Sequence, residues 1–324
     1  MSKPYVFVSG RLYPEAEKLL AEHCEYKVWK GAQPPSREEL KKELAQADGL
    51  ITSGIRIDDE LLSAAPRLRI VSNVSVGYNN FDIEALKKHQ VLATHTPYVL
   101  DDTVADLIIT LMLAAARRVT ELDAMIRAGK WDKPIGDEWF GVDVHHARLG
   151  IIGMGRIGEA VARRARFGFE MDVCYYNRSR KLEAENKLGV RYVTFDELLE
   201  TSDFVVLMTP LTKETEGLMG REQFAKMKRT AIFVNASRGQ TVDEEALVEA
   251  LKNGTIRAAG LDVFCEEPLP PEHPLTKLPN TVLLPHIGSA TVKTRTAMSV
   301  CAVENMIAGL RGETPPNVIP ELRG

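Results

Sequence analysis

The chain has 324 residues, which at roughly 150 residues per domain predicts about two domains. Its 41 Lys and Arg residues against 45 Asp and Glu residues give a net charge of −4, so no broad basic surface is available and no nucleic acid is expected as a partner. The apolar stretch 107–116 is about half of a membrane span and the apolar run near Met1 is too short for a signal peptide, so we expect a cytoplasmic protein without membrane contact.

Short apolar runs alternate with helical patterns in the first hundred residues. Because parallel strands need crossover connections, and both faces of a parallel sheet must be buried, this alternation predicts a parallel sheet covered by helices over roughly residues 1–100. The expected strands are Tyr5–Ser9, Tyr26–Trp29, Gly49–Thr52, Leu68–Ser72 and Val91–Thr94.

A second series of strands follows a long apolar helix, which we expect from about Asp102 to Val119 with Asp101, Asp102 or Thr103 at its N-cap. An amphipathic helix over Ala290–Leu310 follows the last strand. The strands of this second parallel sheet are predicted at Leu149–Ile152, Asp172–Tyr176, Phe204–Met208, Ala231–Asn235, Ala258–Asp262 and Thr281–Leu284.

A glycine-rich loop, Gly153-Met154-Gly155-Arg156-Ile157-Gly158, stands between the predicted strand ending at Ile152 and the helical run Glu159–Arg166. Glycines at these positions permit a tight turn and close backbone approach, so the helix N-terminus can bind the pyrophosphate of a dinucleotide. The alternative is a glycine-rich turn that serves close packing alone. The strand–loop–helix context favours the dinucleotide site.

The residue that binds the adenosine ribose is expected about 20 residues further on, at the tip of the next strand. The tip reads Asn177-Arg178-Ser179 and holds no carboxylate, whereas Arg178, Ser179 and Arg180 are suited to a 2′-phosphate. Asp172 stands at the start of this strand rather than at its tip, so it is not expected to take that place. We therefore predict a preference for NADP(H) with NAD(H) possible, the alternative being a merely solvated basic loop.

Polar residues follow the last three predicted strands, where ligands of open parallel sheets bind. Arg238 offers a planar guanidinium matched to a carboxylate, and His286 can exchange a proton with a developing alkoxide. Glu266 or Glu267 could orient the imidazole and favour its charged form. Each residue alone has a structural explanation, but together, after a dinucleotide loop, they indicate hydride transfer to a 2-oxo acid.

No metal site is expected. His145 and His146 are adjacent, and we expect their side chains to diverge in a structural role. Cysteines stand far apart along the chain and predict neither a disulfide framework nor a zinc site; they are Cys24, Cys174, Cys265 and Cys301.

Several separated motifs resemble the D-isomer-specific 2-hydroxyacid dehydrogenase family. They are spread along the chain from residue 75 to residue 291: residues 75–82, residues 101–106, the glycine loop and the Pro285–Thr291 segment. Within the family, residues 140–146 and the tip 176–178 are most similar to bacterial glyoxylate/hydroxypyruvate reductases, also called 2-ketogluconate reductases.

This resemblance implies an α/β protein with two Rossmann-like domains, in which a dinucleotide-binding domain (101–290) is inserted into a flavodoxin-like substrate domain (1–100 with 291–324). Together with the NADP(H) preference read from Arg178 and its neighbours, it implies NADPH-preferring reduction of glyoxylate, hydroxypyruvate or 2-keto-D-gluconate to D-2-hydroxy acids. Arg238, Glu267 and His286 take the catalytic roles, and Glu267 is chosen over Glu266 because it directly precedes proline. Alternatives are a nucleotide-sensing protein of co-repressor type and a phosphoglycerate dehydrogenase.

The resemblance also assigns binding residues and a homodimer formed through the coenzyme domain. The substrate would contact the backbone of Val76 and Gly77 with Arg238 and His286, and Trp139, in the aromatic arm 131–140, is a candidate for reaching the partner's site. Asp262 would accept a hydrogen bond from the nicotinamide carboxamide. The cofactor residues are Thr103, Gly153, Gly155, Arg156, Ile157, Gly158, Asn177, Arg178, Ser179, Thr209, Pro210, Thr215, Ala236, Arg238, Asp262, His286 and Gly288.

Overall fold

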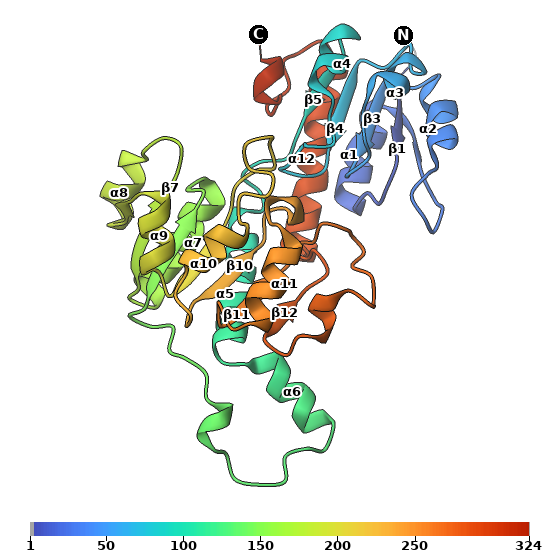
Figure 1. Ribbon diagram of the computed structural model, residues 1–324. Coiled ribbons are helices and arrows are strands. Elements are labelled where there is room, and N and C mark those ends of the chain that lie inside the picture. The colour runs from blue at the N-terminus through green and yellow to red at the C-terminus, as the bar shows by residue number, and fades with distance from the viewer. Residues whose placement is uncertain (1–2, 324) are drawn as a thin grey trace. The chain divides into compact units, whose positions relative to one another are not determined.

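The chain folds into two compact units, which the computed structural model describes over residues 3–323 (Figure 1). The terminal unit comprises the chain up to Leu100 together with the segment from Ser289 onward, and the central unit is Asp101–Gly288. Ser289 and Ala290 therefore cluster with the terminal unit. Both units are built around parallel sheets, which confirms the predicted α/β class.

The terminal unit holds a five-stranded parallel sheet in the order β2-β1-β3-β4-β5, the flavodoxin-like arrangement. Its strands are β1 (Tyr5–Val8), β2 (Glu25–Val28), β3 (Gly49–Thr52), β4 (Ile70–Asn73) and β5 (Leu92–Thr94). Its helices are α1 (Pro14–His23), α2 (Arg37–Leu44), α3 (Asp59–Ser63), α4 (Ile83–Lys88) and α12 (Val292–Leu310).

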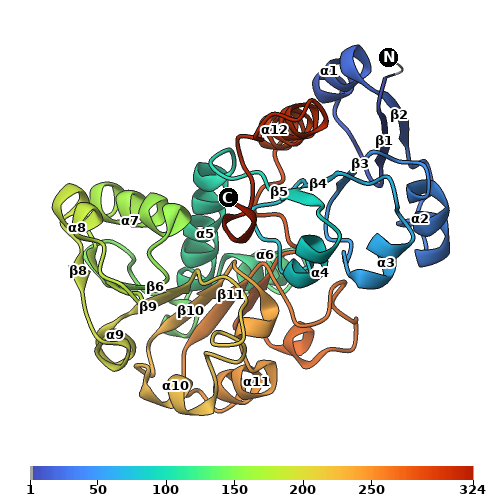
Figure 2. The ribbon, with the colours of Figure 1, turned by 90° about the horizontal axis from the view of Figure 1, so that it is seen from above.

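Helices cover both faces of this sheet, so its strands are apolar on both sides (Figure 2). Val6 and Val8 of β1 pack on the face of α1 and α12, while Phe7 packs on the face of α2, α3 and α4. Because α12 comes from the far end of the chain, the central unit is an insertion into the terminal unit.

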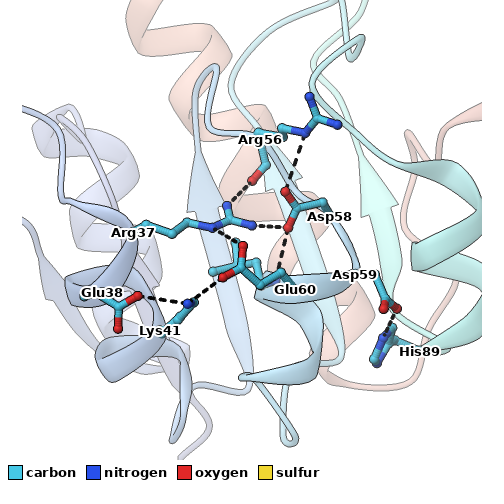
Figure 3. A network of polar contacts seen from close by, with 9 residues as sticks. Arg37, Glu38, Lys41, Arg56, Asp58, Asp59, Glu60 and His89 are labelled. Carbon is cyan, nitrogen blue, oxygen red and sulfur yellow. Dashed lines mark hydrogen bonds and ion pairs between the residues drawn. The ribbon is translucent and has the colours of Figure 1, made fainter.

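Ion pairs on the surface connect α2, α3 and α4 (Figure 3). Arg37 pairs with Asp58, the N-cap of α3, and Lys41 Nζ lies 2.7 Å from Glu60 Oε1. His89 Nε2 lies 2.8 Å from Asp59 Oδ1. Exposed pairs of this kind contribute little stability each, typically about 0.2–1 kcal/mol.

The central unit holds a seven-stranded parallel sheet in the order β12-β11-β10-β9-β6-β7-β8, the Rossmann arrangement. Its strands are β6 (Arg148–Ile152), β7 (Asp172–Tyr176), β8 (Arg191–Tyr192), β9 (Phe204–Leu207), β10 (Ile232–Asn235), β11 (Ala258–Leu261) and β12 (Thr281–Leu283). Its helices are α5 (Asp101–Ala116), α6 (Val119–Arg127), α7 (Arg156–Gly168), α8 (Leu182–Leu188), α9 (Phe195–Thr201), α10 (Arg221–Lys226) and α11 (Glu244–Lys252).

The long predicted helix over 102–119 is two helices. The chain turns at Arg118, which has a left-handed backbone with φ of 55°, and α6 then continues to Arg127. The apolar side of α5 is buried, and Leu111 lies so close to β11 that a Cβ on Gly260 would come within 3.0 Å of it. The acidic first turn of α5 faces α7 rather than capping its own helix, since Asp102 Oδ1 lies 2.7 Å from Arg163 Nη2.

Smaller differences from the predicted elements lie at strand ends and on the sheet edge. The two-residue edge strand β8 was not predicted, because two exposed residues carry no apolar pattern. Predicted and observed boundaries differ by one or two residues, as in β4, which begins at Ile70 rather than Leu68. Over residues 3–323, no helix has the length and apolar character needed to cross a membrane.

Candidate active site

Three neighbouring strands each bring one candidate catalytic residue to the same edge of the central sheet. β10, β11 and β12 lie side by side, and Arg238, Glu267 and His286 follow them in that order. Because parallel strands end at one edge, the loops that carry these residues are neighbours. The charges of Arg238 and His286 both act on the Glu267 carboxyl, so the structure brings the three groups together.

Glu267 and His286 form a hydrogen-bonded pair. Glu267 Oε2 lies 2.7 Å from His286 Nδ1, and its Oε1 accepts a 3.0 Å bond from the Phe264 N–H. Burial works to raise the pKa of Glu267, but the bonds from His286 and Phe264 outweigh it and hold that pKa below its ordinary range. The carboxylate therefore stays ionised and fixes the orientation of the ring, leaving Nε2 as the nitrogen available for proton transfer.

Arg238 is held by its own loop. Asn235, the last residue of β10, donates to the Arg238 carbonyl at 3.0 Å and accepts from the Ser237 N–H at 3.0 Å and the Ser237 hydroxyl at 2.8 Å. Burial lowers the pKa of the Arg238 guanidinium, and the Glu267 carboxylate opposes that effect. The group remains a cation, because an ordinary arginine pKa lies far above neutrality.

The loop of His286 is fixed by a buried carboxylate. His286 has a left-handed backbone with φ of 54°, which costs energy in a non-glycine residue and is retained mainly at functional positions. Asp262, only 1% exposed, accepts from the Ile287 N–H and the Gly288 N–H at 2.8 Å each. Burial raises the pKa of Asp262 and these two bonds oppose the rise. Its expected contact with a nicotinamide carboxamide stays a prediction.

The loops of Arg238 and Glu267 touch each other through their backbones. A Cβ on Gly239 would meet the Phe264 carbonyl carbon at 1.9 Å, so only glycine fits there. Gln240 donates to the Cys265 carbonyl at 2.9 Å, and Glu244 accepts from the Cys265 N–H at 2.8 Å. These positioning residues were not predicted, nor was Asn235; a buried polar residue at the end of an apolar strand is the signal that identifies Asn235.

The glycine loop lies where the predicted dinucleotide site requires it, between β6 and α7. Gly153 has φ of 103°, and a Cβ there would lie 2.7 Å from the Met208 backbone at the end of β9. Gly155 is the N-cap of α7, and a Cβ there would enter open space. The backbone at the start of α7 is therefore not covered by a side chain at Gly155, and the buried Thr209 hydroxyl has no hydrogen-bond partner within residues 3–323. These features fit a dinucleotide pyrophosphate.

The basic residues at the tip of β7 differ in their environment. Arg180 makes a two-pronged ion pair with Glu185, at 2.7 Å for its shortest contact, and the Tyr175 hydroxyl donates to the same carboxylate at 2.8 Å. Arg178 is exposed and forms no ion pair within the described chain. Asn177 turns its side-chain amide toward the Ser179 carbonyl at 3.3 Å. Arg178 is thus the arginine available to an anion.

Other predicted cofactor residues lie on segments at or near the same sheet edge. Thr103 is in the first turn of α5, and Thr209 and Pro210 follow β9. Thr215 donates to the Pro210 carbonyl at 2.6 Å, and Ala236 directly follows β10. These positions keep the expected nucleotide-lining roles open as predictions.

Three further predicted site residues belong to other segments of the chain. Trp139 belongs to a 3₁₀ turn over Asp137–Trp139 in the aromatic arm 131–140, and Val76 and Gly77 belong to the terminal unit, in the loop after β4.

The expectation that His145 and His146 diverge is wrong, since their rings meet edge to face with centroids 4.9 Å apart.

The two histidine rings turn to different carboxylates, at Asp143 and Glu170. Among residues 3–323, no three His, Cys, Asp or Glu side chains gather where they could hold a metal ion.

Known proteins match this chain over nearly its full length. The family model of the D-isomer specific 2-hydroxyacid dehydrogenase NAD binding domain matches residues 109–288. Glyoxylate/hydroxypyruvate reductase B of Serratia proteamaculans is 50% identical over 321 residues, which is 99% of each chain.

Solved structures of other proteins are also similar to this chain over nearly its full length. A protein of Thermus thermophilus is 44% identical with a TM-score of 0.91, over 97% of this chain and 99% of its own. An NADPH-dependent glyoxylate/hydroxypyruvate reductase of Sinorhizobium meliloti, solved with NADP and malonate, is 32% identical with a TM-score of 0.87, over 99% of this chain and 98% of its own. With its Rossmann sheet, glycine loop and Arg–Glu–His group, the chain belongs to the D-isomer specific 2-hydroxyacid dehydrogenase family.

Proposed function

We propose that this protein reduces glyoxylate to glycolate and hydroxypyruvate to D-glycerate, with NADPH as the preferred cofactor. The observation that carries the proposal is the 2.7 Å contact between His286 Nδ1 and Glu267 Oε2, on a loop next to that of the partly buried Arg238. An oriented imidazole beside a guanidinium is the arrangement that reduction of a 2-oxo acid requires. The names of the relatives in Serratia and Sinorhizobium support this choice of substrates.

Each of the chain's groups has a proposed part in the reaction. In the central unit, Arg238 binds the substrate carboxylate and polarises the neighbouring carbonyl. In the terminal unit, the backbone of Val76 and Gly77 is the proposed carboxylate-binding group. His286 delivers a proton from Nε2 to the carbonyl oxygen as negative charge develops there, and Glu267 stabilises the charged ring before the transfer. The nicotinamide, when bound, supplies the hydride that reaches the carbonyl carbon.

The environment of β7 supports the preference for NADPH. A cofactor that carries a 2′-phosphate brings a charge of about −2 to this tip, and a free guanidinium binds it by charge-assisted hydrogen bonds. Arg178 is exposed and without an ion pair within the described residues, whereas Arg180 is already neutralised by Glu185. We assign the 2′-phosphate to Arg178, together with the Ser179 hydroxyl.

Steady-state kinetics with both cofactors tests the assignment of the 2′-phosphate. We expect Arg178→Ala to raise the KM for NADPH about tenfold, the effect of losing a charge-assisted bond, and to leave the KM for NADH within twofold. Arg180→Ala is the matched control. It removes the same positive charge two residues further along the chain, from an arginine that is already paired with Glu185. A wild type that prefers NADH at low concentration would refute the cofactor preference.

A substrate panel tests the reaction itself. We expect turnover with glyoxylate and hydroxypyruvate, and we include 2-keto-D-gluconate as a larger candidate substrate. His286→Ala should lower kcat by about 10²–10⁴-fold, the usual contribution of a general acid, while NADPH affinity stays near that of the wild type. Near-normal turnover of that variant would remove His286 from its role, and no turnover of any 2-oxo acid by the wild type would favour a binding function.

We also propose a homodimer formed through the coenzyme domain, along the segment 119–140 that comprises α6 and the aromatic arm 131–140. No residue of α6 is buried, and in Figure 1 α6 and the chain after it extend away from the central sheet. Five apolar side chains along the segment 119–140 are more than half exposed; they are Val119, Ile126, Trp131, Ile135 and Phe140. An apolar surface of this kind favours association, and sedimentation of the wild type against Ile126→Glu tests it.

A further inference from the structure

Two buried side chains bind consecutive carbonyl groups in the loop that follows β4. His95 Nδ1 lies 2.8 Å from the Val76 carbonyl oxygen, and Asn73 Nδ2 donates to the Gly77 carbonyl oxygen at 2.9 Å. Asn73 ends β4 and His95 directly follows β5, the neighbouring strand. Both donors therefore stand at the same edge of the terminal sheet and turn these carbonyl groups toward it.

A third carbonyl in the same run is held in the same way, since the Thr96 N–H donates to Ser75 O at 2.9 Å. In a planar trans peptide the N–H points opposite to the preceding carbonyl. The N–H groups of Val76, Gly77 and Tyr78 are therefore turned away from their three anchors. Within residues 3–323 none of these three N–H groups donates a hydrogen bond, and successive free amides of this kind form an anion-binding concavity.

The anchor at His95 is itself fixed. Its N–H donates to the Asn317 carbonyl at 3.1 Å, and its carbonyl accepts from Asn305 Nδ2 at 3.1 Å. Its side chain is 8% exposed, and the Tyr78 ring stands edge-on to it with centroids 5.3 Å apart. Because a carbonyl oxygen can only accept, the ring nitrogen facing Val76 must carry the hydrogen. The tautomer and the orientation of His95 are thus determined by its partners.

The anchor at Asn73 leaves one of its own groups unsatisfied. Asn73 is fully buried, and its Oδ1 has no hydrogen-bond partner among the described residues. An unpaired buried acceptor is unfavourable, and each such group in a native protein calls for an explanation. The explanation is that the Gly77 carbonyl needs the amide nitrogen of Asn73 as its donor. An aliphatic residue at position 73 would avoid the unpaired oxygen but would also lose this donor.

We propose that His95 and Asn73 are positioning residues that aim the amides of Val76, Gly77 and Tyr78 at the carboxylate of the substrate. The proposal rests on the proposed function, because it takes the anion to be a 2-oxo acid. It extends the substrate site from the backbone of Val76 and Gly77 to two side chains behind it, and adds the Tyr78 amide as a third donor.

Two substitutions at His95 separate hydrogen bonding from packing. His95→Phe keeps a ring against Tyr78 and removes the donor, whereas His95→Asn removes the ring and keeps an amide nitrogen close to the place of Nδ1. We expect His95→Phe to raise the KM for glyoxylate about tenfold or more, the effect of misaligning charge-assisted bonds. His95→Asn should stay within about threefold of the wild type, and NADPH affinity should change in neither variant.

Calorimetry with oxamate, a carboxylate that is not reduced, measures the same site without turnover. Oxamate added to the NADPH complex should bind His95→Phe about tenfold more weakly than the wild type and His95→Asn nearly as well. His89→Phe is the control, because it removes another histidine hydrogen bond of the terminal unit, the one to Asp59 in Figure 3. Asn73→Ala tests the same amides through Gly77 if His95→Phe does not fold.

The reverse ranking, with His95→Asn impaired and His95→Phe normal, would show that the ring serves packing and would overturn the inference. Unchanged oxamate affinity in both His95→Phe and Asn73→Ala would overturn it as well. Failure of the proposed function would be visible separately, as a wild type that binds oxamate but reduces no 2-oxo acid. The order of the oxamate affinities would still decide between positioning and packing.

Discussion

Two glycines of the same loop should respond to alanine in opposite ways. Gly153 has φ of 103°, and a Cβ there would lie 2.7 Å from the Met208 carbonyl carbon and oxygen, which are backbone atoms that cannot move aside cheaply. At Gly155 a Cβ would meet nothing within 4 Å and would enter the space in front of the α7 N-terminus. Gly153→Ala should therefore damage folding, and Gly155→Ala should damage cofactor binding.

The magnitudes follow from these geometries. For Gly153→Ala the backbone strain costs about 1–3 kcal/mol and the forced contact about 1–3 kcal/mol, or about 2–6 kcal/mol together. At about 2–4 °C per kcal/mol this lowers the melting temperature by roughly 4–24 °C. For Gly155→Ala the loss is that of a poorer N-cap, about 0.5–1 kcal/mol, so the melting temperature falls by at most about 4 °C. The affinity of Gly155→Ala for NADPH should fall about tenfold to hundredfold, because a methyl group fills cofactor space.

Thermal denaturation of the cofactor-free proteins followed by circular dichroism, and fluorescence titration with NADPH, measure the two effects independently. Cofactor must be absent from the melting experiment, since a ligand that binds only the folded state raises its stability. A Gly153→Ala protein that melts within about 1 °C of the wild type would refute the argument from the Met208 contact. A Gly155→Ala protein with unchanged NADPH affinity would refute the placement of the pyrophosphate.

Three further outcomes are expected. Burial works to raise the pKa of Glu267, but the bond from His286 contributes to holding that pKa below its ordinary range. The ionised Glu267 therefore stabilises the fold above that range, and this stabilisation is lost as the pH falls through the lowered pKa. Urea denaturation should accordingly show a difference in unfolding free energy between wild type and Glu267→Gln, at most about 1 kcal/mol for this partly exposed pair, that narrows as the pH falls from about 5 to about 3. A difference that widens over that range would contradict the prediction. Glu244→Ala should lower kcat about threefold to tenfold with NADPH affinity unchanged, because a bond that positions the Glu267 loop is lost, and an unaltered kcat would remove Glu244 from that role. Glu185→Gln should free Arg180 and raise the selectivity for NADPH over NADH about twofold to fivefold, and a fall in that ratio would count against the basic tip as the phosphate site.

Much of this fold can be predicted from the sequence, because its strongest signals are periodic and local. Buried parallel strands read as apolar runs, and the β6–loop–α7 unit combines such a run with glycines at fixed spacing. Arg238 and His286 were predicted as site residues because each stands within three residues of the end of a strand, and strand ends meet at one edge. The choice of Glu267 over Glu266 came from resemblance, since two adjacent carboxylates cannot be ranked by pattern alone.

Features that depend on tertiary contacts were not predictable. The break at Arg118 needs a left-handed backbone at a residue with no preference for it, so no propensity marks it. His145 and His146 meet edge to face although adjacent side chains usually diverge, because His146 also has a positive φ. His95 gains its significance only from the Val76 carbonyl, 19 positions away in the chain, which no local pattern can indicate.

The three proposed catalytic groups lie in the loops that follow three adjacent strands, so the sheet fixes where each of these loops begins. Neighbouring parallel strands keep a spacing of about 4.8 Å that backbone hydrogen bonding dictates, so β10, β11 and β12 set the separation of the points where the loops of Arg238, Glu267 and His286 begin. The substrate range of such an enzyme can therefore change through other side chains around the site, while the sheet keeps the starting points of these three loops fixed.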